Sequence, residues 1–436
     1  MNAPQTFSQP ELSPAATLEA MRLGVVPRGD IEAFTVGRDP EMALVADDLR
    51  RAGERGGALR TFLGGYGAGK THLLELIAHQ ALAANFLVAR AVLDPEETAP
   101  SHPKRVYREL VRSLTYPDRP TGGHASLRPL FERAVGRPEA LEAFCVDERS
   151  RSRKLLDRGA HLYLTPALRY FRALTDASAD LHPEARDDGL SLLFDWLEGH
   201  PTISNMEIDR ALPRMVGRKG RIFSMKDYRP WARIYGYLLS GLSALAREAG
   251  YAGMVVLVDE AEFYSLLSSQ NRDYARSLFK ALAWASLGAD SQLLPFERAE
   301  LDLGGSGILQ ELPPQYGEAP GLYTVFAMTP HAEGIEALGQ AVPDELIAEI
   351  DSFELDDYQA LVARVFECHA HARPGADLDE RHLGALTRVV SSLVSHAYIE
   401  NPRQAMKFVV EFLDIATLRR DRVKDVIAEL RAMYAG

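Results

Sequence analysis

The run Gly64-Gly65-Tyr66-Gly67-Ala68-Gly69-Lys70-Thr71 has the residue types and spacing of a phosphate-binding loop. It fits the pattern G-x-x-x-x-G-K-[ST] in full. Glycines let the backbone curl so that successive N–H groups point at a phosphate, which side chains would obstruct. Lys70 would place its charge against the β- and γ-phosphates of ATP, and the hydroxyl of Thr71 would ligate Mg²⁺.

The flanking sequence supports this interpretation. The apolar run Ala58–Leu63 predicts a strand that ends at the loop, and Thr71–Ala83 has a helical pattern. A helix that begins at the Lys-Thr pair presents free N–H groups and its positive dipole end to an anion. An ordinary glycine-rich turn is the alternative, and the strand–loop–helix context favours the P-loop.

A second candidate site follows the apolar run Met254–Val258. Asp259 and Glu260 come directly after it, and a central parallel strand delivers such acids to its carboxyl-terminal edge, where ligands bind. Asp259 would hold Mg²⁺ through its water shell, and Glu260 would act as general base on the attacking water. The alternative is a helix N-terminus, which also favours acidic residues.

Short apolar runs separated by helical patterns indicate the fold. The predicted strands are Ala58–Leu63, Phe86–Leu93, Met254–Val258 and Leu322–Met328. Strands that alternate with helices predict a parallel sheet covered on both faces, which is a three-layer α/β core.

The spacing of these strands predicts the domain organisation. About 160 residues separate the second and third strands, far more than a helical crossover needs. We expect five segments: a flexible tail at 1–20, a first core part at 21–98, a helical insertion at 99–250, a second core part at 251–352 and a helical lid at 353–436.

Composition limits the class of protein. The net charge is −12, from 49 basic and 61 acidic residues, so the surface as a whole does not attract nucleic acid. The two cysteines, Cys145 and Cys368, are far apart, which is typical of a reducing compartment. With no membrane-length apolar run and no signal-peptide pattern, we expect a cytoplasmic protein without a membrane partner.

A local reversal of charge lies within the predicted insertion. Residues 211–235 include one acid, Asp227, and the basic residues Arg214, Arg218, Lys219, Arg221, Lys226, Arg229 and Arg233. Phe223, Tyr228, Trp231 and Tyr235 are interleaved with them, and a second basic run spans 149–158. Cations for phosphates with aromatics for stacking predict a DNA-binding surface. Alternatively, the aromatics are core residues and the bases are solvated or pair with a protein partner.

At this point the sequence resembles the AAA+ ATPases, in particular the origin-recognition-like clade. Val36-Gly37-Arg38 lies upstream of the P-loop and is similar to a segment that packs against adenine in that clade. A simple turn before a helix is the alternative. The resemblance also implies a sensor role for Thr329, which follows the strand Leu322–Met328, although Asn is commoner there. Arg403, in Asn401-Pro402-Arg403, resembles the lid arginine that reaches the γ-phosphate.

A finer resemblance is to the ATP-binding proteins of BREX phage-defence systems, of the BrxD-like type. It rests on residues 20–27, on the P-loop run through His72-Leu73-Leu74, and on residues 106–110. It implies nucleotide contacts along the P-loop run, His72 included. One departure from AAA+ rings is that no Arg or Lys occurs from Thr329 to Ala363. Either an arginine finger comes from elsewhere, with Arg272, Arg276 and Arg298 as candidates, or the protein does not hydrolyse ATP through a standard ring.

These features together predict an ATP-hydrolysing, DNA-associated motor or switch in phage defence or DNA maintenance. It would act with a helicase- or nuclease-type partner, and a homo-oligomer is compatible with the pattern. One alternative is a regulatory ATPase that binds only proteins. Another is a small-molecule kinase on the same P-loop, which Arg403 in a lid and the length of the chain disfavour.

Overall fold

A computed structural model describes residues 13–25, 31–119, 126–144, 160–178, 181–201, 205–225, 229–301, 312–376 and 378–418. Among these residues, no helix is long and apolar enough to cross a membrane.

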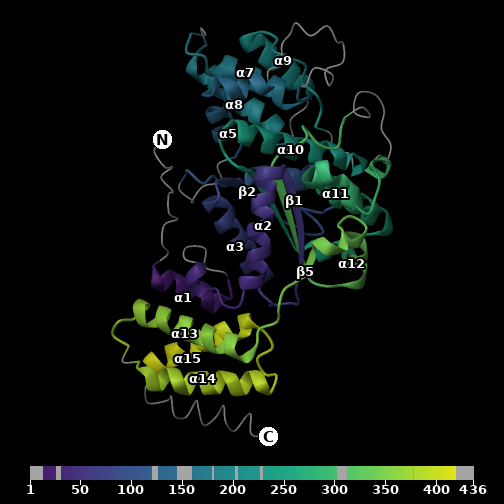
Figure 1. The fold of residues 1–436 in the computed structure, drawn as a ribbon. Helices are drawn as coiled ribbons and strands as arrows, with labels where there is room; N and C mark the ends of the chain where they lie inside the picture. The colour runs from purple at the N-terminus through teal and green to yellow at the C-terminus, as the bar shows by residue number, and fades with distance from the viewer. Residues whose placement is uncertain are drawn as a thin grey trace. The chain divides into compact units, whose positions relative to one another are not determined.

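The chain builds a five-stranded sheet with the order β2-β3-β4-β1-β5. Figure 1 labels β1, β2 and β5 of this sheet. The strands are β1 Gly57–Leu63, β2 Phe86–Val92, β3 Gly253–Asp259, β4 Leu322–Met328 and β5 Ile347–Glu349. The four predicted strands are confirmed within a residue at each end. The three-residue strand β5 was not predicted, because it is too short to show a period.

The central strands are parallel and in continuous register. Residues of β2 pair with β3 from Phe86 opposite Gly253 to Val92 opposite Asp259. Strand β3 then pairs with β4, with Val258 opposite Phe326. Every residue of β3 and β4 is buried, which is why both strands are unbroken apolar runs in the sequence.

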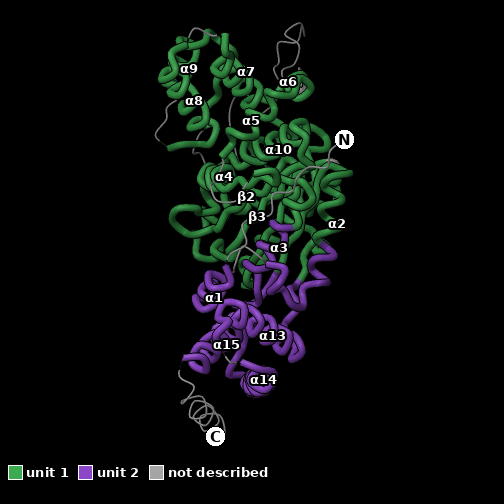
Figure 2. Tube along the Cα trace, turned by 90° about the vertical axis from the view of Figure 1, so that its left-hand side faces the viewer, with its two compact units in different colours: residues 1–6, 45–62, 80–348 green, residues 7–44, 63–79, 349–436 purple. Residues whose placement is uncertain are grey.

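The residues group into two compact units, coloured in Figure 2. Unit 1 comprises residues 1–6, 45–62 and 80–348, and unit 2 comprises residues 7–44, 63–79 and 349–436. Two helices run through a boundary: α2 (Asp39–Arg55) and α3 (Lys70–Ala83) each contribute residues to both units.

Unit 1 contains the predicted helical insertion, between β2 and β3. Its helices are α4 Pro103–Arg112, α5 Arg128–Val135, α6 Pro138–Phe144, α7 Leu164–Thr175, α8 Pro183–Leu197, α9 Asn205–Val216 and α10 Ala232–Glu248. Helix α10 contacts both β3 and β4, and it also contacts α5, α6 and α7 (Figure 1). This helix therefore joins the insertion to the sheet. Beyond β3 follow α11 Ser269–Leu287 and α12 Ala332–Gly339.

Short 3₁₀ helices connect several of these elements. They are η1 Glu32–Phe34, η3 Arg229–Trp231, η4 Ala261–Leu266, η5 Gly288–Leu293, η6 Arg298–Leu301 and η8 Asp344–Leu346.

Unit 2 is a helical bundle that carries the P-loop segment. Helices α13 (Leu355–Ala372), α14 (Glu380–Ser395) and α15 (Pro402–Leu418) pack on one another around a shared apolar core. Their apolar positions, three and four residues apart, predicted this all-helical region.

The N-terminal helix α1 (Pro14–Leu23) belongs to the same core, which corrects the prediction of a flexible tail through residue 20. Leu18 and Met21 are buried against α13 and α15. Ser13 caps the first turn, and Gly24 ends the helix in a left-handed conformation, φ 70°. Residues 1–12 lie outside the described part of the chain.

Candidate functional site

The P-loop glycines adopt a conformation that other residues avoid. Gly67 and Gly69 have φ values of 79° and 97°, in the left-handed region where a Cβ is strained. A Cβ added to Gly67 would lie 2.5 Å from Cγ of Asn401. The loop therefore forms a cradle that only glycine permits, and α3 begins directly after it at Lys70. This arrangement fits a phosphate group.

Lys70 is nearly buried, with an exposed fraction of 8%. Its Nζ donates to the carbonyl oxygens of Gly64 at 3.1 Å and Gly65 at 3.4 Å. The ammonium group is therefore folded back over the start of the loop. Thr71 is exposed in the first turn of α3.

The segment before α2 is tied to the P-loop by side chains. Arg38 is 3% exposed, and its Nη2 donates to the carbonyl oxygen of Ala68 at 2.7 Å. The hydroxyl of Thr35 lies 2.9 Å from Nε2 of His72. Val36 packs against the core of the helical bundle. The guanidinium of Arg38 is thus bonded to protein groups, and contact of Val36, Gly37 and Arg38 with adenine stays a prediction.

The hydrogen-bond partners of Thr35 determine the state of His72. The Thr35 hydroxyl donates to the carbonyl oxygen of Ile31 at 2.8 Å, so it must accept from Nε2–H of the imidazole. Burial, and then the charge of Arg38, lower the pKa of His72 to about 4. His72 is therefore neutral near pH 7 and adds no positive charge beside the P-loop.

Arg403 lies beside the P-loop within unit 2. Its Nη1 is 3.5 Å from the hydroxyl of Tyr66, and its Cζ is 5.6 Å from the centre of that ring. Asn401 begins the same helix, since its Oδ1 accepts from N–H of Gln404 at 3.0 Å. Its contact with Gly67 was not predicted, although an Asn before a Pro is a recognisable helix start.

The acidic pair lies at the end of β3 in unit 1. Asp259 is 6% exposed, and its Oδ1 accepts from N–H of Glu260 at 2.9 Å. Glu260 has φ 59° and ψ 36°, a left-handed conformation that costs a non-glycine residue about 1–2 kcal/mol. Strained residues of this kind cluster at functional sites. Thr329 follows the neighbouring parallel strand β4, so all three residues leave the sheet at the same edge.

The predicted site residues are thus distributed over both units. The P-loop, Val36-Gly37-Arg38, His72 and Arg403 belong to unit 2. Asp259, Glu260 and Thr329 belong to unit 1.

The three arginine-finger candidates differ in their contacts. Arg272 donates to the carbonyl oxygens of Ser265 and Leu267 and pairs with Glu333 at 2.8 Å. Arg276 pairs with Asp273. Arg298 is exposed in η6, whereas Arg272 and Arg276 are half-buried.

In the basic segment of the insertion, several basic side chains are exposed, whereas two of the aromatic side chains are buried. Arg214, Arg218, Lys219 and Arg221 are exposed at the end of α9 and beyond it. Phe223 and Tyr235 are buried in the core, at 7% and 1% exposure, and Arg233 is also buried. The prediction that these two aromatics stack on bases is therefore wrong, because they complete the core instead. Residues 226–228, and the basic run at 149–158, lie outside the described residues.

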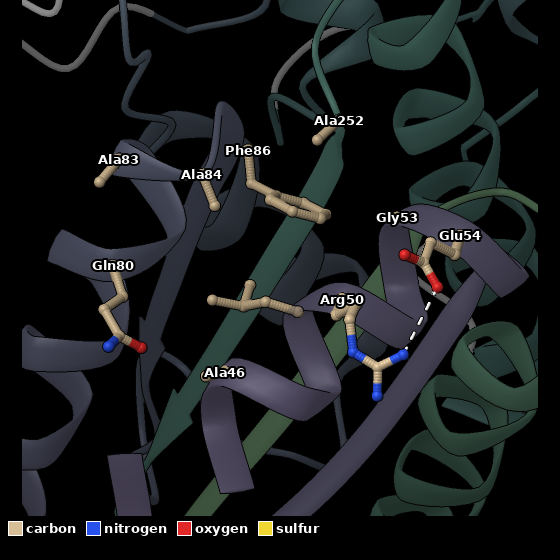
Figure 3. A pocket seen from close by; sticks show the side chains of 10 residues that line it. Ala46, Arg50, Gly53, Glu54, Gln80, Ala83, Ala84, Phe86 and Ala252 are labelled. Atoms are coloured by element: carbon tan, nitrogen blue, oxygen red, sulfur yellow. Dashed lines mark ion pairs between the residues drawn. The ribbon is translucent and has the colours of Figure 1, made fainter. Parts of the chain in front are cut away.

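Unit 1 also contains an apolar groove (Figure 3). It has a volume of about 550 Å³. Helix α2 lines it with Ala46, Leu49, Arg50, Gly53 and Glu54, and the rest of the lining is Gln80, Ala83, Ala84, Phe86 and Ala252. Phe86 begins β2, and Ala252 directly precedes β3. The groove therefore lies at the amino ends of these strands, whereas Asp259 and Glu260 follow the carboxyl end of β3.

The parallel sheet, with a glycine loop between β1 and α3, defines an α/β P-loop core. Residues 11–156 match the family model of the BREX system ATP-binding protein BrxC/D. The match includes the P-loop and the segment around Arg38, and it confirms the predicted resemblance over this part of the chain. No curated protein matches the sequence.

Proposed function

We propose that the protein binds ATP·Mg²⁺ at the P-loop and hydrolyses it. The observation that carries this proposal is the cradle formed by Gly67 and Gly69 directly before Lys70, within a segment that matches an ATP-binding family. Bound phosphates would take the loop N–H groups and the Lys70 ammonium as donors.

The metal and the attacking water would be held by few protein groups, as is usual for Mg²⁺ with a nucleotide. Thr71 would ligate the ion, and Asp259 would hold it through water. Glu260 would accept the proton of the attacking water. Thr329 and Arg403 would contact the γ-phosphate.

The direct test is Lys70→Ala. Binding of a fluorescent ATP analogue should fall at least tenfold, with the circular dichroism spectrum unchanged, because the lysine charge is needed mainly against phosphate. Lys407→Ala, at a lysine outside the P-loop, is the matched control and should bind normally. Wild-type affinity and turnover in Lys70→Ala would refute the proposal.

We further propose that the ATPase works on DNA in phage defence, with a helicase- or nuclease-type partner. The exposed arginine and lysine side chains at the end of α9 and in the segment after it support contact with DNA phosphates. A function restricted to protein partners is the second candidate, and the burial of Phe223 and Tyr235 favours it.

The isolated protein should be a slow ATPase that DNA or a partner stimulates. Arg298, exposed in η6, would act on a site in another molecule, whether a partner or a second copy. Turnover measured across protein concentrations, with and without DNA, tests this proposal. Fast turnover by a monomer without DNA would contradict it.

A further inference from the structure

Arg38 and Glu41 form a buried ion pair at the start of α2. Their exposed fractions are 3% and 2%, and Nη1 of Arg38 lies 2.9 Å from Oε1 of Glu41. A pair this deeply buried loses its hydration, which its own attraction offsets only when further hydrogen bonds surround it. These further hydrogen bonds link the pair to two other segments of unit 2.

The first of these segments contains Asp351, whose backbone N–H and C=O groups both form hydrogen bonds with the pair. Nη1 of Arg38 donates to the Asp351 carbonyl oxygen at 2.9 Å, and the Asp351 N–H donates to Oε1 of Glu41 at 3.2 Å. The Arg38 guanidinium also lies over the ring of Phe353, 5.0 Å from its centre. Residues 350–354 connect β5 to α13, so the pair fixes the segment that leads into the C-terminal helices.

On the other side, the same guanidinium holds the P-loop. Nη2 of Arg38 donates to the carbonyl oxygen of Ala68 at 2.7 Å. The guanidinium is planar and rigid, so its two terminal nitrogens cannot move independently. A shift of the Ala68 peptide must therefore change the geometry at Asp351.

The pair is not fully satisfied in this arrangement. Oε2 of Glu41 is buried, and no donor reaches it among the described residues. An unpaired buried carboxylate oxygen costs free energy.

We propose that Arg38 is a positioning residue that couples occupancy of the P-loop to the segment 350–354 and, through it, to α13. This inference rests on the proposed ATP binding. Phosphates would draw the loop N–H groups toward themselves, which turns the Ala68 peptide and moves its carbonyl oxygen. The Arg38 guanidinium moves with that oxygen, and its hydrogen bond to the Asp351 carbonyl oxygen changes in geometry.

The test is hydrogen exchange of the full chain, followed by mass spectrometry, with and without ATP·Mg²⁺. In the wild type, ATP should slow exchange in peptides covering 64–71 and change it in peptides covering 349–362. The Asp351 amide is a direct reporter, since Glu41 accepts from it. In Arg38→Lys, the response at 64–71 should remain and that at 349–362 should vanish, because one ammonium cannot span both carbonyls as the planar fork does.

Two further variants complete the design. Arg50→Lys changes an exposed arginine of the same helix, 56% exposed at its side chain, and should behave as the wild type. Glu41→Ala removes the acceptor of the Asp351 N–H and changes neither atom of the bond between Arg38 and Ala68, and it should also remove the response at 349–362. It keeps the test decisive if Arg38→Lys does not fold.

The outcomes separate the two proposals. If the wild type shows no ATP response at 64–71, the proposed ATP binding fails, and the coupling falls with it. If the wild type responds at 64–71 but not at 349–362, ATP binding stands and the coupling is refuted. The coupling is equally refuted if folded Arg38→Lys keeps both responses, or loses both, since Arg38 would then be dispensable or would only build the loop.

Discussion

The P-loop and the acidic pair after β3 are positioned in different ways. The loop is held by side chains that arrive from both ends of the chain: Arg38 bonds to Ala68, and Asn401 packs on Gly67. The acidic pair depends on two consecutive residues at the end of a fully buried strand. Substitutions remote in sequence should therefore disturb the loop, whereas the position of the acidic pair is set by the buried strand that precedes it.

The largest expected effect is at the acidic pair. Glu260→Gln removes the proposed base but keeps the size of the side chain, so turnover should fall by about 10²–10⁴-fold while ATP binding persists. Steady-state hydrolysis and equilibrium binding measure the two quantities. Glu262→Gln, two residues further on, is the control and should hydrolyse ATP normally. Normal turnover in Glu260→Gln would show that another group is the base.

The second largest effect is expected at the contact between Gly67 and Asn401. Gly67→Ala adds a Cβ at positive φ and against Asn401, so ATP affinity should fall by roughly 5- to 150-fold, equivalent to about 1–3 kcal/mol. Adding Asn401→Ala to that variant should recover part of the loss, because the clash is removed and the strain remains. Calorimetric titration measures both. Independent, additive effects would mean that Asn401 does not control the loop.

Most of the sheet and the P-loop could be predicted, because their patterns are local. The strands are apolar runs, and Gly64 to Thr71 is a contiguous motif. The bonds of Arg38 to Ala68 and Asp351 could not be predicted, since they join residues that are separated by 30 and 313 positions. The packing of α1 on α13 and α15 was missed for the same reason. Buried Phe223 and Tyr235 were misjudged because interleaved aromatics look alike in a core and on a stacking surface.

A smaller effect concerns the protonation of His72 beside the loop. Its pKa, about 4, lies below the ordinary value of 6.5, so the unfolded chain binds a proton there first. The contribution of the neutral His72 imidazole to the free energy of unfolding is therefore complete above pH 6.5, and it decreases as the pH falls toward 4. At pH 5 the loss should be on the order of 2 kcal/mol.

His72→Gln keeps a donor for Thr35 and removes this titration. Urea unfolding of both proteins at pH 7 and pH 5 should show a smaller loss of stability in the variant. Other histidines titrate equally in both proteins, so the difference isolates His72. Identical pH dependence would place the His72 imidazole in contact with solvent.

The smallest effect is expected on the insertion, which carries neither the loop nor the acidic pair. Reversing the charge of Arg218, Lys219 and Arg221 to Glu should weaken DNA binding uniformly across sequences. It should also flatten the plot of log affinity against log salt by up to about three units, one for each phosphate that is no longer neutralised. Reversal of Arg381 and Arg388, exposed in α14, is the control. An unchanged slope would leave the protein-only function as the better account.

The position of α1 has a consequence for how the chain is made. Leu18 and Met21 bury their side chains against helices that begin at residue 355, so the N-terminal helix emerges from the ribosome long before its partners exist. During synthesis its apolar face must stay exposed or be shielded by a chaperone. The bundle can close only after α13, α14 and α15 have been made, and such sequence-distant contacts fold slowly. Stalled synthesis at residue 352 should therefore leave α1 sensitive to protease.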